Sequence, residues 1–79
     1  MKITKVEVFE VQTRRPAWRP ILCRIYTDEG VYGDGEAALA YGTAAPAAAG
    51  MIRDLAKLIV GMDPLDSEGI WDKLYKATF

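Results

Sequence analysis

The 79-residue sequence contains no histidine at all. Without an imidazole, the chain lacks the side chain best suited to general base catalysis near neutral pH, and a zinc site would depend on one cysteine and carboxylates. The single Cys23 excludes an internal disulfide framework and suits a reducing, cytoplasmic compartment. If the chain belongs to an enzyme, we therefore expect the catalytic groups to lie elsewhere.

Long hydrophobic runs and an excess of charge of one sign are also missing. No apolar run approaches the ~20 residues that span a bilayer, and the start, MKITKVEVFEVQ, alternates where a signal peptide would have an apolar core. Ten basic residues against eleven acidic ones leave a net charge of -1, whereas nucleic-acid binders usually carry a basic excess. We therefore expect no membrane partner and no nucleic-acid partner.

The first half of the chain predicts three antiparallel strands. Residues 2–12 are rich in β-branched and aromatic types, but the apolar phase slips twice, which indicates a bulge or two partly covered faces. Residues 13–20 hold two prolines and form a loop, and residues 21–27 alternate cleanly as a second strand. A tight turn at Gly30 leads into a third strand at 31–37, so the strands form a meander.

The second half predicts helices. An alanine-rich stretch begins as a loop and becomes an amphipathic helix over about 45–60, with Thr43 as N-cap, Pro46 in the first turn and Gly61 just past the end. The fold class is therefore α+β: a three-stranded antiparallel sheet followed by a helical segment of two or more helices.

The second of these helices begins near Asp63 or Asp66, either of which can cap it. Its apolar face consists of Ile70, Trp71, Leu74 and Tyr75. The stretch LYKATF at 74–79 has no helix stop signal, so we expect the helix to run to Phe79 and the chain to be cut from something longer.

Two motifs suggest chemistry that their context does not support. GDGEAA at 33–38, followed by Asp54, matches a dinucleotide fingerprint, but a second helix follows the first where that fold needs a parallel strand. Asp28, Asp34 and Glu36 offer carboxylates for a hard cation, yet their spacing matches no calcium loop and no further oxygen ligands cluster nearby. An ordinary turn and an edge-strand face explain them better.

The loop sequence RRPAWRP is the stronger candidate. Arg14, Arg15 and Arg19 with the interleaved Trp18 have the composition to grip phosphates or bases, or to hold a carboxylate bidentately. The alternative is a solvated loop in which Trp18 merely covers the sheet.

Three segments together resemble a known family. MKITKVEVFEV, TDEGVYGDGEA and LIVGMDPLDSEGIWDKLY, in this order and spacing, resemble the N-terminal capping domain of the enolase superfamily, in its mandelate racemase / muconate lactonizing enzyme branch. The likeness covers essentially the whole chain. It implies that residues 1–79 are a capping domain whose catalytic (β/α)₈-type barrel is absent, and that the small residues at 33–38 let another backbone approach closely.

The resemblance also implies a site. In such enzymes two cap segments close the active site, here the loop at 13–20 and the segment at about 38–43. The implied substrate-binding residues are Arg14, Arg15, Trp18, Arg19 and Tyr41. The catalytic bases and the ligands of Mg²⁺ lie on the barrel, so no catalytic or metal-binding residue, and no bound cofactor, is expected within this chain. The implied partners are the C-terminal barrel of the parent chain and a carboxylate-bearing small molecule.

The implied function is that of a substrate-specificity cap on an Mg²⁺-dependent enzyme that abstracts the proton α to a carboxylate. An arginine-rich closing loop favours a polyhydroxylated acid or diacid, hence a sugar-acid dehydratase; a racemase, epimerase or cycloisomerase of the same branch is the alternative. A different class also stays open, a stand-alone module that binds nucleic acid or an acidic partner through 14–19. Because a cap keeps an apolar face, we also expect a homo-oligomer.

Overall fold

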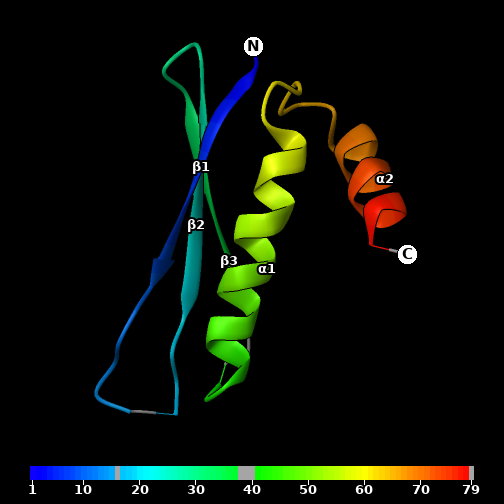
Figure 1. The fold of residues 1–79 in the computed structure, drawn as a ribbon. Coiled ribbons are helices and arrows are strands. Elements are labelled where there is room, and N and C mark those ends of the chain that lie inside the picture. Colours follow the sequence, from blue (N-terminus) through cyan, green and yellow to red (C-terminus); the bar gives the residue numbers. More distant parts are fainter. Residues whose placement is uncertain (16, 38–40, 79) are drawn as a thin grey trace.

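The structure is a computed structural model that describes residues 1–15, 17–37 and 41–78. Its elements are β1 (Ile3–Glu10), β2 (Ile21–Thr27), β3 (Tyr32–Ala37), α1 (Ala44–Ile59) and α2 (Ser67–Ala77). The strands form one sheet in the order β1-β2-β3, with both pairs antiparallel. α1 lies along the sheet, and α2 stands beyond α1 (Figure 1). The predicted α+β meander with two helices is confirmed.

A bulge in β1 sets which side chains face the helix. The pairing of β1 with β2 shifts register between Ile3 and Lys5, as the broken apolar pattern predicts. Beyond the bulge, Val8 pairs with Cys23 on the face that α1 covers, whereas Phe9 lies on the opposite face and stays 39% exposed. Both faces of the sheet therefore carry apolar side chains, and only one is covered by the helix.

The core is small and lies between α1 and the β1–β2 half of the sheet. Ile21 in β2 and Ala45 and Ala49 in α1 are fully buried together, with Val8 and Ile52 packed against them. Because the two alanines lie one helical turn apart, they present a flat stripe that lets the helix axis approach the strands. The alanine-rich composition of this stretch is therefore explained by packing.

The ends of α1 are formed as predicted in position, though not in every contact. Thr43 occupies the N-cap, but its side chain makes no capping hydrogen bond. At the other end Gly61 has φ 91°, the left-handed conformation expected after a helix, and its N–H donates to the Ile3 carbonyl oxygen at 2.8 Å. The Ile3 N–H in turn donates to the Met62 carbonyl oxygen at 2.8 Å, so the end of α1 is fastened to β1.

α2 is capped at both ends, and the expectation that it runs to Phe79 is wrong. Asp66 accepts a hydrogen bond from the Gly69 N–H at 3.0 Å, and the helix ends at Ala77. Thr78 is the C-cap: its N–H donates to the Tyr75 carbonyl oxygen at 3.3 Å, and its hydroxyl donates to the Leu74 carbonyl oxygen at 3.1 Å. Phe79 lies outside the described residues. Among the helices described, neither has the length and apolar character needed to cross a bilayer.

Candidate substrate-binding site

The predicted site residues lie at one end of the sheet. The loop between β1 and β2 and the residues just before α1 meet there, at the bottom of Figure 1, while the β2–β3 turn lies at the opposite end. This placement follows from the meander, because the end of β1, the start of β2 and the end of β3 all lie at the same end of the sheet.

Thr13 organises the arginine-rich loop. Its hydroxyl shares its hydrogen between the carbonyl oxygens of Arg15 and Trp18, at 2.8 and 2.7 Å, and accepts a hydrogen bond from the Arg15 N–H at 3.2 Å. The Trp18 N–H also donates to the Arg15 carbonyl oxygen at 2.9 Å, which closes a tight turn. One side-chain oxygen therefore ties Thr13 to Arg15 and Trp18, as Ser and Thr side chains do in turns, while Pro16 lies outside the described residues.

The two predicted closing segments touch each other. Trp18 and Tyr41 form an isolated antiparallel β-bridge, and the Gly42 N–H donates to the Ala17 carbonyl oxygen at 3.0 Å. Gly42 has φ 52°, a conformation that suits glycine at this crossing. Of the predicted segment 38–43, residues 38–40 lie outside the described residues, so the contact is defined by Tyr41 and Gly42.

The segments border an open hollow of about 440 Å³ lined by Arg15, Ala17, Trp18 and Tyr41. Trp18 is 44% exposed and Tyr41 50% exposed, so two aromatic faces stand partly open to solvent. Of the five predicted site residues, the structure brings Arg15, Trp18 and Tyr41 to this hollow. Arg14 and Arg19 belong to the same loop but are not part of the lining.

The arginines of the loop differ from the other arginines of the chain in their ion pairing. Arg24 is paired with Asp34 and Arg53 with Glu10. The other three of the five arginines, Arg14, Arg15 and Arg19, are not paired with any carboxylate among the residues that the structure describes. Arg15 therefore lines an aromatic hollow without a carboxylate partner among the described residues, and Arg14 and Arg19 add two more such arginines to the same loop, a composition suited to an anionic ligand.

Sequence reasoning missed two contributors, Thr13 and Ala17. Ala17 lines the hollow, and its carbonyl oxygen accepts the hydrogen bond from the Gly42 N–H. An alanine side chain gives no sign of either role in the sequence. Thr13 was detectable in principle, since a threonine two residues before Arg15 in a proline-containing loop is typical of a side-chain-closed turn.

The acidic residues of the third strand have a structural partner. Arg24 donates two hydrogen bonds to Asp34, from Nε to Oδ1 at 2.7 Å and from an Nη to Oδ2 at 3.1 Å. This bidentate pair lowers the pKa of the Asp34 carboxyl below its usual value and raises the pKa of the guanidinium. The Arg24 guanidinium also lies 4.1 Å from the centroid of the Tyr32 ring.

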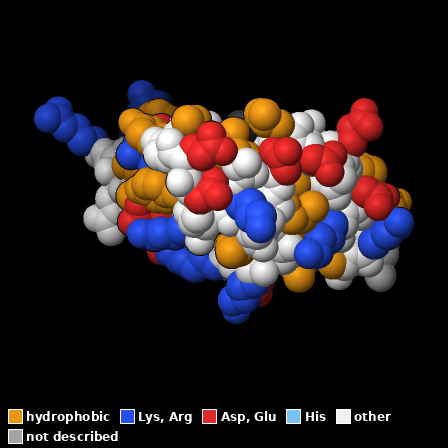
Figure 2. Space-filling model, turned by 90° about the horizontal axis from the view of Figure 1, so that it is seen from above, with side chains coloured by type: hydrophobic (Ala, Val, Ile, Leu, Met, Phe, Trp, Pro, Cys, Tyr) orange, Lys and Arg blue, Asp and Glu red, His pale blue; other side chains and the backbone are white. Residues whose placement is uncertain are grey.

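A second polar contact lies on the same outer face of the sheet. The Tyr26 hydroxyl donates to Glu7 Oε1 at 2.7 Å, and this hydrogen bond raises the pKa of the tyrosine. The Lys5 ammonium lies 5.3 Å from the centroid of the same ring. Figure 2, which views the molecule from above, shows basic, acidic and hydrophobic side chains interspersed. The surface seen in this view offers no broad basic area for nucleic acid.

The structure gives no support for the metal site or the dinucleotide site that two sequence motifs suggest. Within residues 1–15, 17–37 and 41–78, no group of three His, Cys, Asp or Glu side chains is placed to hold a metal ion. Asp54 lies on an exposed face of α1 with Lys57 3.5 Å away, and a helix follows α1 where a dinucleotide fold requires a strand. Asp34 and Asp54 therefore take part in surface ion pairs, and Asp28 accepts a hydrogen bond from the Lys2 N–H at 2.8 Å.

Comparison with known proteins identifies the family. The sequence model of the mandelate racemase / muconate lactonizing enzyme N-terminal domain matches residues 4–79. The chain belongs to this family, as the three segments quoted above indicate. A D-galactonate dehydratase family member of Oceanicola granulosus is 38% identical over 80 residues, and a D-galactonate dehydratase of Pectobacterium atrosepticum is 35% identical over 79 residues.

Solved structures agree in fold. A putative dehydratase from Zymomonas mobilis superposes with a TM-score of 0.90 at 54% identity, covering 99% of this chain and 20% of that one. A member of the enolase superfamily from Salmonella Typhimurium gives a TM-score of 0.88 at 49% identity, covering 99% and 20%. The two dehydratase sequences are likewise matched over 100% of this chain but only 18% and 19% of their own length. The chain thus spans about a fifth of the relatives it matches.

Proposed function

We propose that residues 1–79 form the substrate-specificity cap of a longer enolase-superfamily enzyme, a sugar-acid dehydratase that works in the cytoplasm. The observation that carries this proposal is the junction of Trp18 with Tyr41, which joins two segments beside a hollow lined by Arg15, an arginine without a carboxylate partner among the described residues. The relatives named D-galactonate dehydratase support the choice of substrate class.

The chemistry of the site suits a polyhydroxylated carboxylate. A guanidinium group binds a carboxylate through two parallel hydrogen bonds, and an exposed aromatic face packs against the C–H groups of a sugar chain. Arg15 therefore holds the acid end of the substrate, and Trp18 with Tyr41 forms the wall along its carbon chain. Closing such a hollow excludes water and orients the substrate for the reaction.

The reaction itself belongs to the rest of the enzyme. Dehydration of an aldonate removes the proton at C2 and the hydroxyl group at C3, and the resulting enol becomes a 2-oxo-3-deoxy acid. The chain has no histidine, and its described residues do not fit a magnesium site, so neither the base nor the Mg²⁺ expected of the whole enzyme is assigned to it. We expect the 79-residue chain alone to have no turnover.

The experiment is a substrate panel on the full-length enzyme. Aldonates including D-galactonate, together with an α-hydroxy acid that lacks a sugar chain, are incubated with the enzyme, and 2-oxo-3-deoxy acid formation is followed. Turnover of an aldonate with loss of water supports the proposal. Isotope exchange at C2 without loss of water would instead make the parent a racemase or epimerase, and a cyclised product would make it a cycloisomerase.

The stand-alone binding module is tested separately. If the 79-residue chain binds single-stranded nucleic acid or an acidic peptide, and the binding weakens steeply as salt rises, the loop serves as an electrostatic grip. We expect no such binding, since the three arginines are confined to one loop and the chain has a net charge of -1.

A further inference from the structure

Thr13 contacts the candidate site from outside the hollow. It is half-buried and is not among the described residues that line the hollow. Its hydroxyl nevertheless lies within hydrogen-bonding distance of three backbone groups, which belong to Arg15 and Trp18. Both of these residues line the hollow, so one side-chain oxygen is joined to two residues that a bound substrate would meet.

The backbone of Arg15 is bonded to this oxygen through both of its polar groups. The Arg15 N–H donates to Thr13 Oγ1 at 3.2 Å, and the Arg15 carbonyl oxygen accepts from the Thr13 hydroxyl at 2.8 Å. The guanidinium group of Arg15 has no carboxylate partner among the described residues. Arg15 is thus held by its backbone and not by an ion pair of its side chain, which leaves the guanidinium group available to a ligand.

These contacts need a side-chain group that both donates and accepts hydrogen bonds. A hydroxyl oxygen does both, so it can bind an N–H and a carbonyl oxygen at the same time. Valine resembles threonine in shape but offers neither function, whereas serine keeps the hydroxyl and loses only the methyl group. The two substitutions therefore separate the role of the hydroxyl from that of the side-chain shape.

We infer that Thr13 is a positioning residue for substrate binding: its hydroxyl ties the backbone of Arg15 to that of Trp18 and so sets where the Arg15 guanidinium group meets the substrate. This inference rests on the proposed function, in which Arg15 holds the acid end of the substrate. Thr13 itself does not touch the substrate. Its effect on the rate is still large, because displacing a binding group by about 1 Å can cost about 100-fold.

The test is the kinetics of Thr13 variants of the full-length enzyme, measured on the acid of the substrate panel that the enzyme converts fastest. Thr13→Val should lower kcat/KM by roughly 10- to 100-fold, because the loop loses the contacts that hold Arg15. Thr13→Ser should restore most of the wild-type value, because it keeps the hydroxyl. Equal losses in both variants would overturn the inference, since the hydroxyl would then not be the cause.

An Arg15→Ala background separates positioning from general damage to the protein. If Thr13 acts through Arg15, Thr13→Val should lower kcat/KM by less than about 3-fold in a protein that already lacks the Arg15 side chain. A purely structural role would lower kcat/KM by the same factor in both backgrounds, because unfolding removes active enzyme whichever residue follows Arg14. Equal factors in the two backgrounds would therefore overturn the inference.

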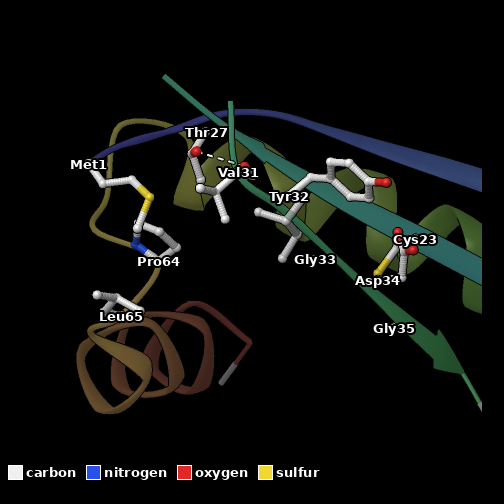
Figure 3. A pocket seen from close by; sticks show the side chains of 11 residues that line it. Met1, Cys23, Thr27, Val31, Tyr32, Gly33, Asp34, Gly35, Pro64 and Leu65 are labelled. Carbon is white, nitrogen blue, oxygen red and sulfur yellow. Dashed lines mark hydrogen bonds between the residues drawn. The ribbon is translucent and has the colours of Figure 1, made fainter. Parts of the chain in front are cut away.

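Thr27 provides a matched control at the opposite end of the sheet. Like Thr13 it is half-buried, and its hydroxyl donates to the Val31 carbonyl oxygen at 2.7 Å across the β2–β3 turn (Figure 3). Thr27→Val removes the same kind of hydrogen bond, from a hydroxyl to a backbone carbonyl group, at a residue that does not line the hollow. It should leave kcat/KM at the wild-type value. A loss as large as that of Thr13→Val would overturn the inference.

Hydrogen exchange followed by mass spectrometry gives a readout that needs no substrate. In the full-length Thr13→Val variant, the peptide that covers residues 13–20 should exchange faster than in the wild type, because the Arg15 N–H loses its acceptor. Thr13→Ser should restore slow exchange. Faster exchange with unchanged kinetics would overturn the inference, because Thr13 would then hold the loop without any effect on the substrate. Unchanged exchange would overturn it as well.

The outcomes separate this inference from the proposed function. Loss of activity in Arg15→Ala but not in Thr13→Val removes only the role of Thr13. Wild-type kinetics in Arg15→Ala removes the proposed binding site and this inference together. If the fastest reaction proceeds without loss of water, only the dehydratase is removed, and the Thr13 variants are compared on that reaction.

Discussion

Trp18 and Tyr41 pair through their backbones, although 22 positions separate them and neither belongs to a strand of the sheet. With the hydrogen bond from the Gly42 N–H to the Ala17 carbonyl oxygen, this bridge fastens the β1–β2 loop to the start of α1. The two segments are therefore joined by a backbone bridge and a hydrogen bond.

The first prediction concerns Arg15 in the full-length enzyme. If Arg15 binds the substrate carboxylate as proposed, Arg15→Ala removes one charge-assisted contact, so kcat/KM should fall by roughly 10- to 1,000-fold. Trp18→Ala should lower kcat/KM as well, because it removes the wall of the hollow and the bridge partner of Tyr41. Steady-state kinetics on the preferred aldonate measure both effects.

Arg53→Ala is the matched control for these variants. Arg53 is also an exposed arginine, but it lies on α1 and pairs with Glu10 at 3.2 Å, away from the hollow. Its removal should leave kcat/KM at the wild-type value. If the alanine variants of Arg14, Arg15, Trp18 and Arg19 all have the kinetics of the wild type, the loop does not bind substrate and is only a solvated connection between two strands.

The second prediction concerns the core. Ile21 is fully buried, and Ile21→Ala should lower the free energy of unfolding of the 79-residue chain by about 2–5 kcal/mol. That is a large share of the total for so small a domain, so the cooperative urea transition should be nearly lost. Leu65→Ala, at a side chain that is 78% exposed, should shift the transition far less. Similar losses in both variants would contradict the core described here.

The third prediction has an unusual sign. Replacing a helical glycine by alanine normally stabilises a helix by about 1 kcal/mol, but a Cβ on Gly69 would collide with the carboxylate of Asp66, which caps α2. Gly69→Ala should therefore give no stabilisation, because displacing that cap costs about 0.5–2 kcal/mol. In an Asp66→Ala background the same substitution should stabilise. A double-mutant cycle measured by urea unfolding detects this coupling, and additive effects would rule it out.

The fourth prediction follows from the Arg24–Asp34 pair. The two hydrogen bonds hold the pKa of Asp34 below its usual value in the folded state, so the unfolded chain binds this proton more readily. The pair therefore stabilises the fold above the ordinary carboxyl pKa, and this contribution is lost as pH falls through the folded-state value. An NMR titration of the Asp34 carboxyl from about pH 5 to about pH 2 covers this range. In the Arg24→Gln variant Asp34 should titrate higher; equal values in both proteins would contradict the prediction.

The fifth prediction is that the 79-residue chain self-associates. Trp71 is 64% exposed and stacks on Tyr75, and Met51 on α1 is 61% exposed, so the helical side of the molecule carries several open apolar side chains. Sedimentation at about 100 μM should show species larger than the monomer if the dissociation constant is micromolar. Trp71→Lys should weaken the association, whereas Lys73→Gln on the same helix should not. A single 8.7 kDa species in the wild type would oppose this prediction.

The strands and most helix boundaries could be predicted from the sequence, because each depends on residues that are close together in the chain. Alternation in residues 21–27 identified β2, and Gly61 and Asp66 marked helix boundaries through their own backbone and side-chain chemistry. The end of α2 was missed because Thr78, its C-cap, carries no glycine or proline signal, and its hydroxyl bonds back to the carbonyl groups of Leu74 and Tyr75.

The candidate site was harder to predict, because it depends on a meeting of distant segments. Composition pointed to Arg14, Arg15, Trp18 and Arg19, but it did not reveal that Tyr41 would pair with Trp18 or that Arg14 and Arg19 would lie outside the hollow. Pairing with Tyr41 is set by where the meander and the start of α1 converge, which is a property of the assembled sheet.

The position of Thr13 bears on which residues of the domain can change during evolution. The Thr13 hydroxyl binds two backbone carbonyl groups of the loop, those of Arg15 and Trp18. The buried contacts of Ile21, Ala45 and Ala49 lie instead in the sheet and the helix. Residues between Thr13 and Trp18 can therefore be exchanged with little effect on folding. If the loop binds the substrate as proposed, substitutions at a few loop positions change the ligand preference while the fold is kept, and libraries that vary positions 14, 15 and 17 should keep most members folded.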